Sequence, residues 1–89
     1  MSPTEFERRY RMPDIYDFMN GNGVDIVLAH KFGQQLLVTG PFPAKKCGGN
    51  GNVIYWIERA GARITNQLPL DAVLKGESSG RLIRCKPLQ

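Results

Sequence analysis

The sequence predicts an α+β fold that is mainly β, a small antiparallel sheet of four to five strands with N-terminal helical turns packed on it. Two observations carry this prediction. Short runs rich in β-branched and aromatic residues recur from residue 24 onward, with Gly, Asn and Pro between them. A helix-start signal precedes them at the N-terminus. We therefore divide the 89 residues into a helical appendage, residues 1–22, and a small β domain, residues 23–89, which together form one folding unit.

The helix-start signal of the appendage is a capping box. Ser2 can cap the helix, Pro3 suits the first helical position, and Glu5 follows three residues after Ser2. Pro13 is expected to end this helix, and Asp14 to cap a second short turn. The apolar side chains of both turns are expected to pack on the sheet, with a partner-binding helix as the alternative. They are Phe6, Tyr10, Ile15 and Phe18.

The predicted strands are short runs bounded by turn-forming residues. They cover residues 24–29, 34–38, 53–57 and 62–65, a strand that follows 70–74, and an edge strand over Arg81–Cys85. The segments between them are rich in Gly, Pro, Asn or Ser and are predicted to be turns and loops. These are residues 31–33, 39–43, 44–52, 66–69 and 76–80, of which 44–52 is a flexible basic loop carrying Lys45 and Lys46.

Composition limits the classes of function. The net charge of +4 and the pI of about 9.4 permit binding to nucleic acid or to an acidic protein surface, and require neither. No run approaches the roughly 20 apolar residues that cross a bilayer. The N-terminus lacks the apolar core of a secretory signal. We therefore expect an intracellular protein that makes no membrane contact.

The potential metal ligands and nucleophiles are few. Cys47, Cys85 and His30 are too widely spaced to fill a tetrahedral zinc site, so we expect no metal and no cofactor. Free thiols are favoured in a reducing compartment, with a Cys47–Cys85 disulfide as the alternative. His30 has no Ser, Cys or Asp beside it in a recognisable motif. We therefore expect no catalytic residue and no enzymatic activity.

Several blocks between residues 26 and 80 occur in the order found in FLYWCH-type zinc fingers, and the chain resembles that family. The matching residues are Gly33 with Leu36-Leu37, Gly40 with Phe42, the pair Tyr55-Trp56, the pair Ala62-Arg63, and the segment 73–77. The four zinc-ligand positions of the family fall on Glu58, Ala60, Ser78 and Gly80, none of which is Cys or His. The resemblance therefore implies a domain without metal. It also implies DNA binding or protein contact in a chromatin setting, and hence a nuclear location.

Three functions remain open. The first is a non-enzymatic protein-interaction module, in a chromatin or nucleic-acid-associated complex, whose edge strand accepts a strand from a partner or from a second copy. The alternative is direct binding of DNA or RNA through the basic loop and a strand edge. The third is a small viral or phage inhibitor that acts by protein contact. The candidate contact residues are Lys45, Lys46, Arg59, Arg63, Lys75, Arg81, Arg84 and Phe42.

Overall fold

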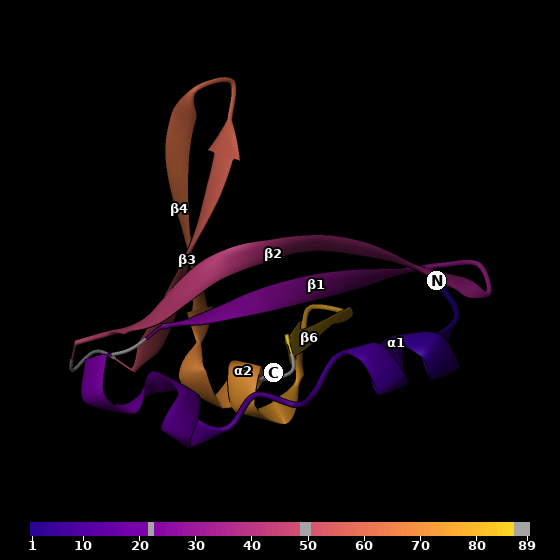
Figure 1. The fold of residues 1–89 in the computed structure, drawn as a ribbon, viewed down its shortest axis with the longest axis horizontal. Coiled ribbons are helices and arrows are strands. Elements are labelled where there is room, and N and C mark those ends of the chain that lie inside the picture. Colours follow the sequence, from indigo (N-terminus) through magenta and orange to yellow (C-terminus); the bar gives the residue numbers. More distant parts are fainter. Residues whose placement is uncertain (22, 49–50, 87–89) are drawn as a thin grey trace.

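A computed structural model describes residues 1–21, 23–48 and 51–86 of the chain. Within them six strands form one antiparallel sheet, in the spatial order β4-β3-β2-β1-β6-β5 (Figure 1). The mainly β prediction is confirmed, with six strands in place of four to five. The strands are β1 (Val24–Phe32), β2 (Gln35–Cys47), β3 (Asn52–Arg59), β4 (Ala62–Pro69), β5 (Glu77–Ser78) and β6 (Arg81–Cys85). The helical segments are α1 (Pro3–Arg9), the 3-10 helix η1 (Ile15–Gly21) and α2 (Leu70–Lys75).

The two N-terminal helical segments begin as their capping residues predict. The backbone N–H of Glu5 donates to Ser2 Oγ at 3.1 Å, and the N–H of Tyr16 donates to Asp14 Oδ1 at 3.0 Å. The helix α1 ends at Arg9 and not at Pro13, because Tyr10 already has extended backbone angles. Phe6 and Tyr10 share one face as expected, with ring centroids 5.2 Å apart.

The core lies on both sides of β1. Because successive strand residues point to opposite faces, Ile26 and Leu28 enter one buried cluster while Val27 and Ala29 enter another. Phe6 of α1 fills the second cluster, whereas Phe18 of η1 and Val73 of α2 fill the first. The prediction for Ile15 is wrong, because η1 turns that side chain outward and leaves it 37% exposed.

The strand β2 continues through the segment predicted to break it. Thr39, Phe42 and Pro43 remain in register with β1, and the register shift between Ile26 and Leu28 absorbs one extra β2 residue as a bulge. Gly40 makes this possible: its φ is +107°, and a Cβ there would lie 2.9 Å from the carbonyl oxygen of Ile26. The hairpin turn lies at Gly33-Gln34, so Lys31 and Phe32 belong to β1.

Lys45 and Lys46 also lie in β2, so the prediction of a flexible loop from residue 44 is wrong. Their registered partners in β3 are Ile54 and Val53. Residues 49 and 50 of the predicted loop lie outside the described residues. The strand continues because Ala44 is buried and anchors this part of β2 in the core beside Tyr55.

Two C-terminal predictions are also corrected. Residues 66–69 belong to β4 because β3 pairs with them, and residues 70–75 form α2, which ends at Gly76 in the left-handed conformation (φ 84°). The strand β6 is not an edge strand, because it lies between β1 and β5. Its remaining backbone groups are also covered: the Ile83 N–H donates to the Gly76 carbonyl, and Cys85 exchanges hydrogen bonds with Arg11.

The β1–β2 and β3–β4 hairpins diverge and leave a fork between them. They are paired only where Ala44–Cys47 meets Asn52–Tyr55. Beyond that stretch Pro41 and Pro43 offer no backbone N–H, so β2 cannot continue a ladder with β3. In Figure 1 the β3–β4 hairpin projects away from the side of the sheet where the helical segments lie. All residues from 58 to 65 are exposed.

Candidate functional site

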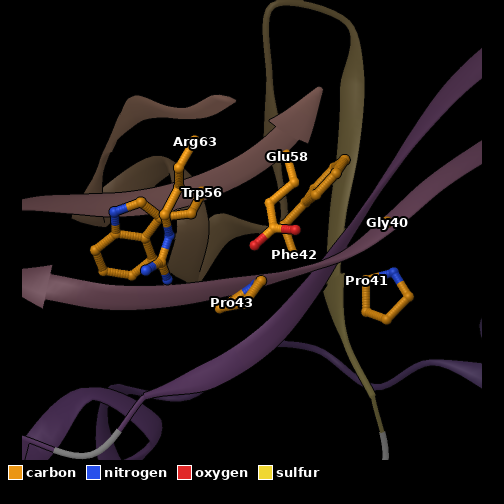
Figure 2. A pocket seen from close by; sticks show the side chains of 7 residues that line it. All are labelled: Gly40, Pro41, Phe42, Pro43, Trp56, Glu58 and Arg63. Atoms are coloured by element: carbon orange, nitrogen blue, oxygen red, sulfur yellow. The ribbon is translucent and has the colours of Figure 1, made fainter. Parts of the chain in front are cut away.

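A hollow of about 390 Å³ lies in the fork between the two hairpins (Figure 2). One wall is the bulged part of β2, and the other is formed by side chains of β3 and β4. The lining combines aromatic and proline rings with one carboxylate and one guanidinium, so it is about equally polar and apolar. The lining residues are Gly40, Pro41, Phe42, Pro43, Trp56, Glu58 and Arg63.

The Arg63 guanidinium packs over the indole of Trp56. Its Cζ lies 5.1 Å from the ring centroid, within the range of a cation–π interaction. Trp56 stands opposite Thr65 in the ladder, and Glu58 stands opposite Arg63, so Trp56 and Arg63 are diagonal neighbours on one face of the hairpin. The β3–β4 register therefore places this pair together.

Glu58 does not pair with Arg63, although the two residues stand directly opposite each other. Within the described residues the ion pairs join Glu5 to Arg9, Arg11 to Asp17, and Glu7 to Arg84. Figure 2 shows the Arg63 guanidinium beside Trp56 and the Glu58 carboxylate reaching toward Phe42 and Pro43. The hollow thus contains an acidic group, Glu58, that no cationic side chain of the described residues approaches within ion-pair distance.

Phe42 forms a fixed part of the β2 wall. Its ring is half-buried, packs against the first core cluster, and lies 5.7 Å from the ring of Tyr55 between centroids. Because Tyr55 is itself buried in that cluster, the Phe42 ring is held from behind by the core. The hollow is therefore preorganised on this side.

The outer edge of β4 is open, because β4 is the terminal strand of the sheet. The β3–β4 turn consists of Ala60 and Gly61, with φ values of 52° and 79°. Two positive φ values define a type I′ turn, in which the flanking residues form the first hydrogen-bonded pair. Alternation along the ladder then directs the backbone N–H and C=O groups of Arg63, Thr65 and Gln67 outward. An extended segment can pair with these groups.

The predicted contact residues do not form one surface. Only Phe42 and Arg63 line the fork hollow. Arg59 is exposed at the end of β3, and Lys75 is exposed on α2, while Arg81 is half-buried on β6. Lys45 and Lys46 line a different hollow of about 610 Å³ beside the η1 residues Ile15, Phe18 and Met19. The sheet order separates these basic groups.

Arg84 is removed from the set of contact residues because it is only 8% exposed. Its Nη1 donates to the carbonyl oxygens of Gly76 at 2.8 Å and Ile83 at 2.9 Å, and Nη2 reaches Glu7 Oε1 at 2.9 Å. The guanidinium also lies 5.7 Å from the centroid of the Phe6 ring. Arg84 therefore joins α1 to β6 and the α2 end.

Sequence reasoning did not assign Trp56, Glu58, Pro41 or Pro43 to a binding site. Trp56 was assigned to a predicted strand and to an aromatic pair, and Glu58 to a lost ligand position. The available signal was the turn at Ala60-Gly61, because a two-residue turn places Glu58 opposite Arg63 and Trp56 diagonal to it. Pro41 and Pro43 flank Phe42, and that pattern indicates where a β2–β3 ladder must stop.

Within the described residues, no group of three or more His, Cys, Asp or Glu side chains is placed to hold a metal ion. Cys47 and Cys85 are free thiols, as expected. Burial, together with the nearby Asp17 carboxylate, raises the pKa of the Cys85 thiol to about 12. No helix in the described part of the chain is long and apolar enough to cross a membrane.

No protein-family model matches the chain, and no curated protein and no solved structure is significantly similar to it.

Proposed function

We propose that this protein is a non-enzymatic protein-interaction module that binds an extended segment of a partner protein along the edge of β4. One observation carries the proposal: β4 is a terminal strand whose outer edge pairs with no other described strand, on a projecting hairpin with residues 58–65 exposed, and its Arg63 side chain lines the fork hollow. Backbone hydrogen bonds to an added strand supply affinity, and a neighbouring pocket supplies specificity. The resemblance to FLYWCH domains adds a chromatin or nucleic-acid-associated complex, and thus a nuclear location, to the proposal.

The placement of the basic residues gives less support to direct DNA or RNA binding. A phosphate backbone is bound by Lys and Arg side chains that converge along one stripe or groove. Here Lys45 and Lys46 lie beside η1, Lys75 lies on α2, and Arg84 is buried against Phe6. The projecting hairpin itself carries Arg59 and Arg63 with Glu58 between them in the fold. Its charge is therefore mixed.

The variant Thr65→Pro tests strand addition, because it removes one outward-facing N–H from the middle of β4. Proline is tolerated in edge strands where its nitrogen faces solvent, so the variant is expected to fold. Thr65→Ala is the matched control, since it keeps the N–H and loses the same side chain. Extended peptides selected from a displayed library for binding to the wild-type protein supply the ligands.

We expect these peptides to bind Thr65→Pro at least about tenfold more weakly than Thr65→Ala. Hydrogen exchange should also slow at the Arg63, Thr65 and Gln67 amides when peptide is bound. Equal binding to both variants, with folding verified by circular dichroism, would place the binding surface elsewhere. A wild-type dimer that Thr65→Pro converts to monomer would show that the edge takes a second copy of this chain in place of another protein.

A further inference from the structure

We propose that the fork hollow selects an arginine side chain of the partner segment, with Glu58 as its counter-charge. This inference rests on the proposed function, because it assumes that a protein segment lies along β4. An arginine side chain that enters the hollow would distinguish one partner segment from another. The occupant follows from the charge and shape of the hollow.

The charge argument starts from the Glu58 and Arg63 pair. In an antiparallel ladder, side chains of a non-hydrogen-bonded pair are the closest opposite neighbours, and the two-residue turn places this pair in that class. Arg63 nevertheless packs on Trp56, and no ion pair within the described residues involves Glu58. The carboxylate therefore reaches into the hollow without a cation and complements a positively charged ligand (Figure 2).

The shape argument favours arginine over lysine. Ring side chains line the hollow: those of Pro41, Phe42 and Pro43 from β2, and the indole of Trp56 from β3, over which Arg63 packs. A guanidinium is planar and weakly hydrated, so it stacks on such surfaces and can bind a carboxylate in a bidentate way. A lysine ammonium is a compact and strongly hydrated charge that uses flat walls less well.

The contact of Arg63 with Trp56, at 5.1 Å, shows that an aromatic ring of this hollow binds a guanidinium, and the rings left for a ligand arginine are those of Phe42, Pro41 and Pro43. Arg63 is engaged with Trp56, whereas Glu58 has no ion-pair partner among the described residues, so the hollow favours a cationic side chain over an acidic one. Asp25, opposite Pro43, and Lys45, two residues further along β2, carry charges of opposite sign, and neither residue lines the hollow. Glu58 thus sets the preference inside the hollow.

The test uses a fixed seven-residue probe, acetyl-Thr-Val-Thr-X-Thr-Val-Thr-amide, in which X is arginine, citrulline, lysine or glutamate. Citrulline keeps the shape of arginine and removes its charge, so it is the matched control for the ligand. Trp56 is the single tryptophan of the chain, and its fluorescence therefore reports binding at the hollow itself. Backbone amide NMR shifts of Arg63, Thr65 and Gln67 report strand addition separately.

We expect the arginine peptide to bind about tenfold more tightly than the citrulline peptide, as a charge-assisted pair beside aromatic walls allows. In Glu58→Gln this preference should fall to about twofold or less. The control Glu77→Gln removes an exposed carboxylate from β5, at the far edge of the sheet, and should keep the full preference. The lysine peptide should bind more weakly than the arginine peptide.

Two results would overturn the inference while leaving the proposed function intact. One is equal binding of all four peptides with shifts at the β4 amides, and the other is tightest binding of the glutamate peptide. An unchanged arginine preference in Glu58→Gln would equally remove Glu58 as the counter-charge. If no peptide changes the Trp56 fluorescence, the inference about the hollow is wrong. Strand addition to β4 would then be tested by the Thr65→Pro comparison alone.

Discussion

The Arg84 side chain of the last strand binds the Glu7 side chain of the first helix, with Nη2 2.9 Å from Oε1, across 77 residues of sequence. The two partners differ in environment. The Arg84 side chain is 10% exposed and the Glu7 side chain 54% exposed. The pair therefore stabilises the protein chiefly through what surrounds Arg84: two backbone carbonyl groups and the face of Phe6. A surface ion pair alone would contribute little.

Arg84→Ala is expected to lower the free energy of unfolding by about 2–4 kcal/mol, because it removes buried hydrogen bonds and packing against Phe6. Glu7→Gln should cost less than about 1 kcal/mol, since Glu7 is half-exposed. Arg81→Ala, on the same strand, should stay within about 0.5 kcal/mol. Urea denaturation of the three variants measures these differences. Equal losses for Arg84→Ala and Arg81→Ala would show that the buried contacts of Arg84 do not stabilise the fold.

The helical appendage is expected to be required for folding. Phe6 and Phe18 are 0% and 4% exposed, and each belongs to a core cluster with sheet residues. Removing a buried aromatic side chain costs about 3–5 kcal/mol, against a total stability of about 5–15 kcal/mol for a domain. Deletion of residues 1–20 should therefore abolish cooperative thermal unfolding. Cooperative melting of the shortened chain would show that the β domain folds alone.

Single substitutions separate this packing effect from the loss of chain length. Phe18→Ala should destabilise by about 3–5 kcal/mol, whereas Ile15→Ala, at a side chain 37% exposed, should cost about 1 kcal/mol or less. Both residues lie in η1, so a helix propensity effect would act on both variants alike. Similar losses at the two positions would contradict the burial difference.

Stability is expected to fall in acid through Asp17. Its carboxylate binds the Arg11 guanidinium in a bidentate way, at 2.6 Å and 2.9 Å, and accepts the Asp14 N–H at 2.8 Å. The hydrogen bonds from Arg11 hold the pKa of Asp17 below its ordinary value of 3.8. The folded state thus binds this proton less readily than the unfolded chain. The stabilisation is complete above pH 3.8 and is lost as the pH falls through the lower pKa of the folded state.

Asp17→Asn should lower the free energy of unfolding by about 1–3 kcal/mol at pH 7, because it removes charge-assisted hydrogen bonds. The difference between wild type and this variant should narrow as the pH falls below 3.8. Urea denaturation at pH 7, 4 and about 2.5 measures it. Asp71→Asn, at an exposed carboxylate of α2, is the control and should show no such convergence. If the difference in free energy of unfolding between wild type and Asp17→Asn does not change with pH, the acid sensitivity does not come from Asp17.

Local signals in the sequence were sufficient for the helix starts and for the mainly β fold, because capping by Ser2 and Asp14 depends on residues two or three positions away. The long path of β2 was not predictable in this way. Its prolines break a ladder locally, and only the bulge opposite β1 and the glycine at residue 40 keep the strand continuous. Burial of Arg84 depends on Glu7 and Phe6, at the other end of the chain.

The fork hollow is partly predictable from local sequence and partly dependent on tertiary structure. Its β3–β4 half follows from a two-residue turn, which fixes Glu58 opposite Arg63. A turn between the predicted strands 53–57 and 62–65 was expected, but its two-residue type I′ form was not, because type I′ turns favour Asn-Gly and this one has Ala60 before Gly61. The other half of the hollow requires β2 and β3 to separate after Tyr55, which is a tertiary arrangement.

Replacing Ala60 by a residue that suits its backbone conformation better should therefore stabilise the protein. Its φ of 52° is unfavourable for a residue with a Cβ, and Asn tolerates that conformation better than Ala. Ala60→Asn should raise the free energy of unfolding by about 0.5–1 kcal/mol, and Ala60→Val should lower it by about 1–2 kcal/mol. Ser79→Asn tests the same effect at a φ of 53° in the β5–β6 turn and should also stabilise. Urea denaturation measures all three variants. The Ala60→Asn change leaves the β3–β4 register intact, so the Trp56 fluorescence response to the arginine peptide should be unchanged. A lower free energy of unfolding in Ala60→Asn would contradict a type I′ turn at the end of the hairpin.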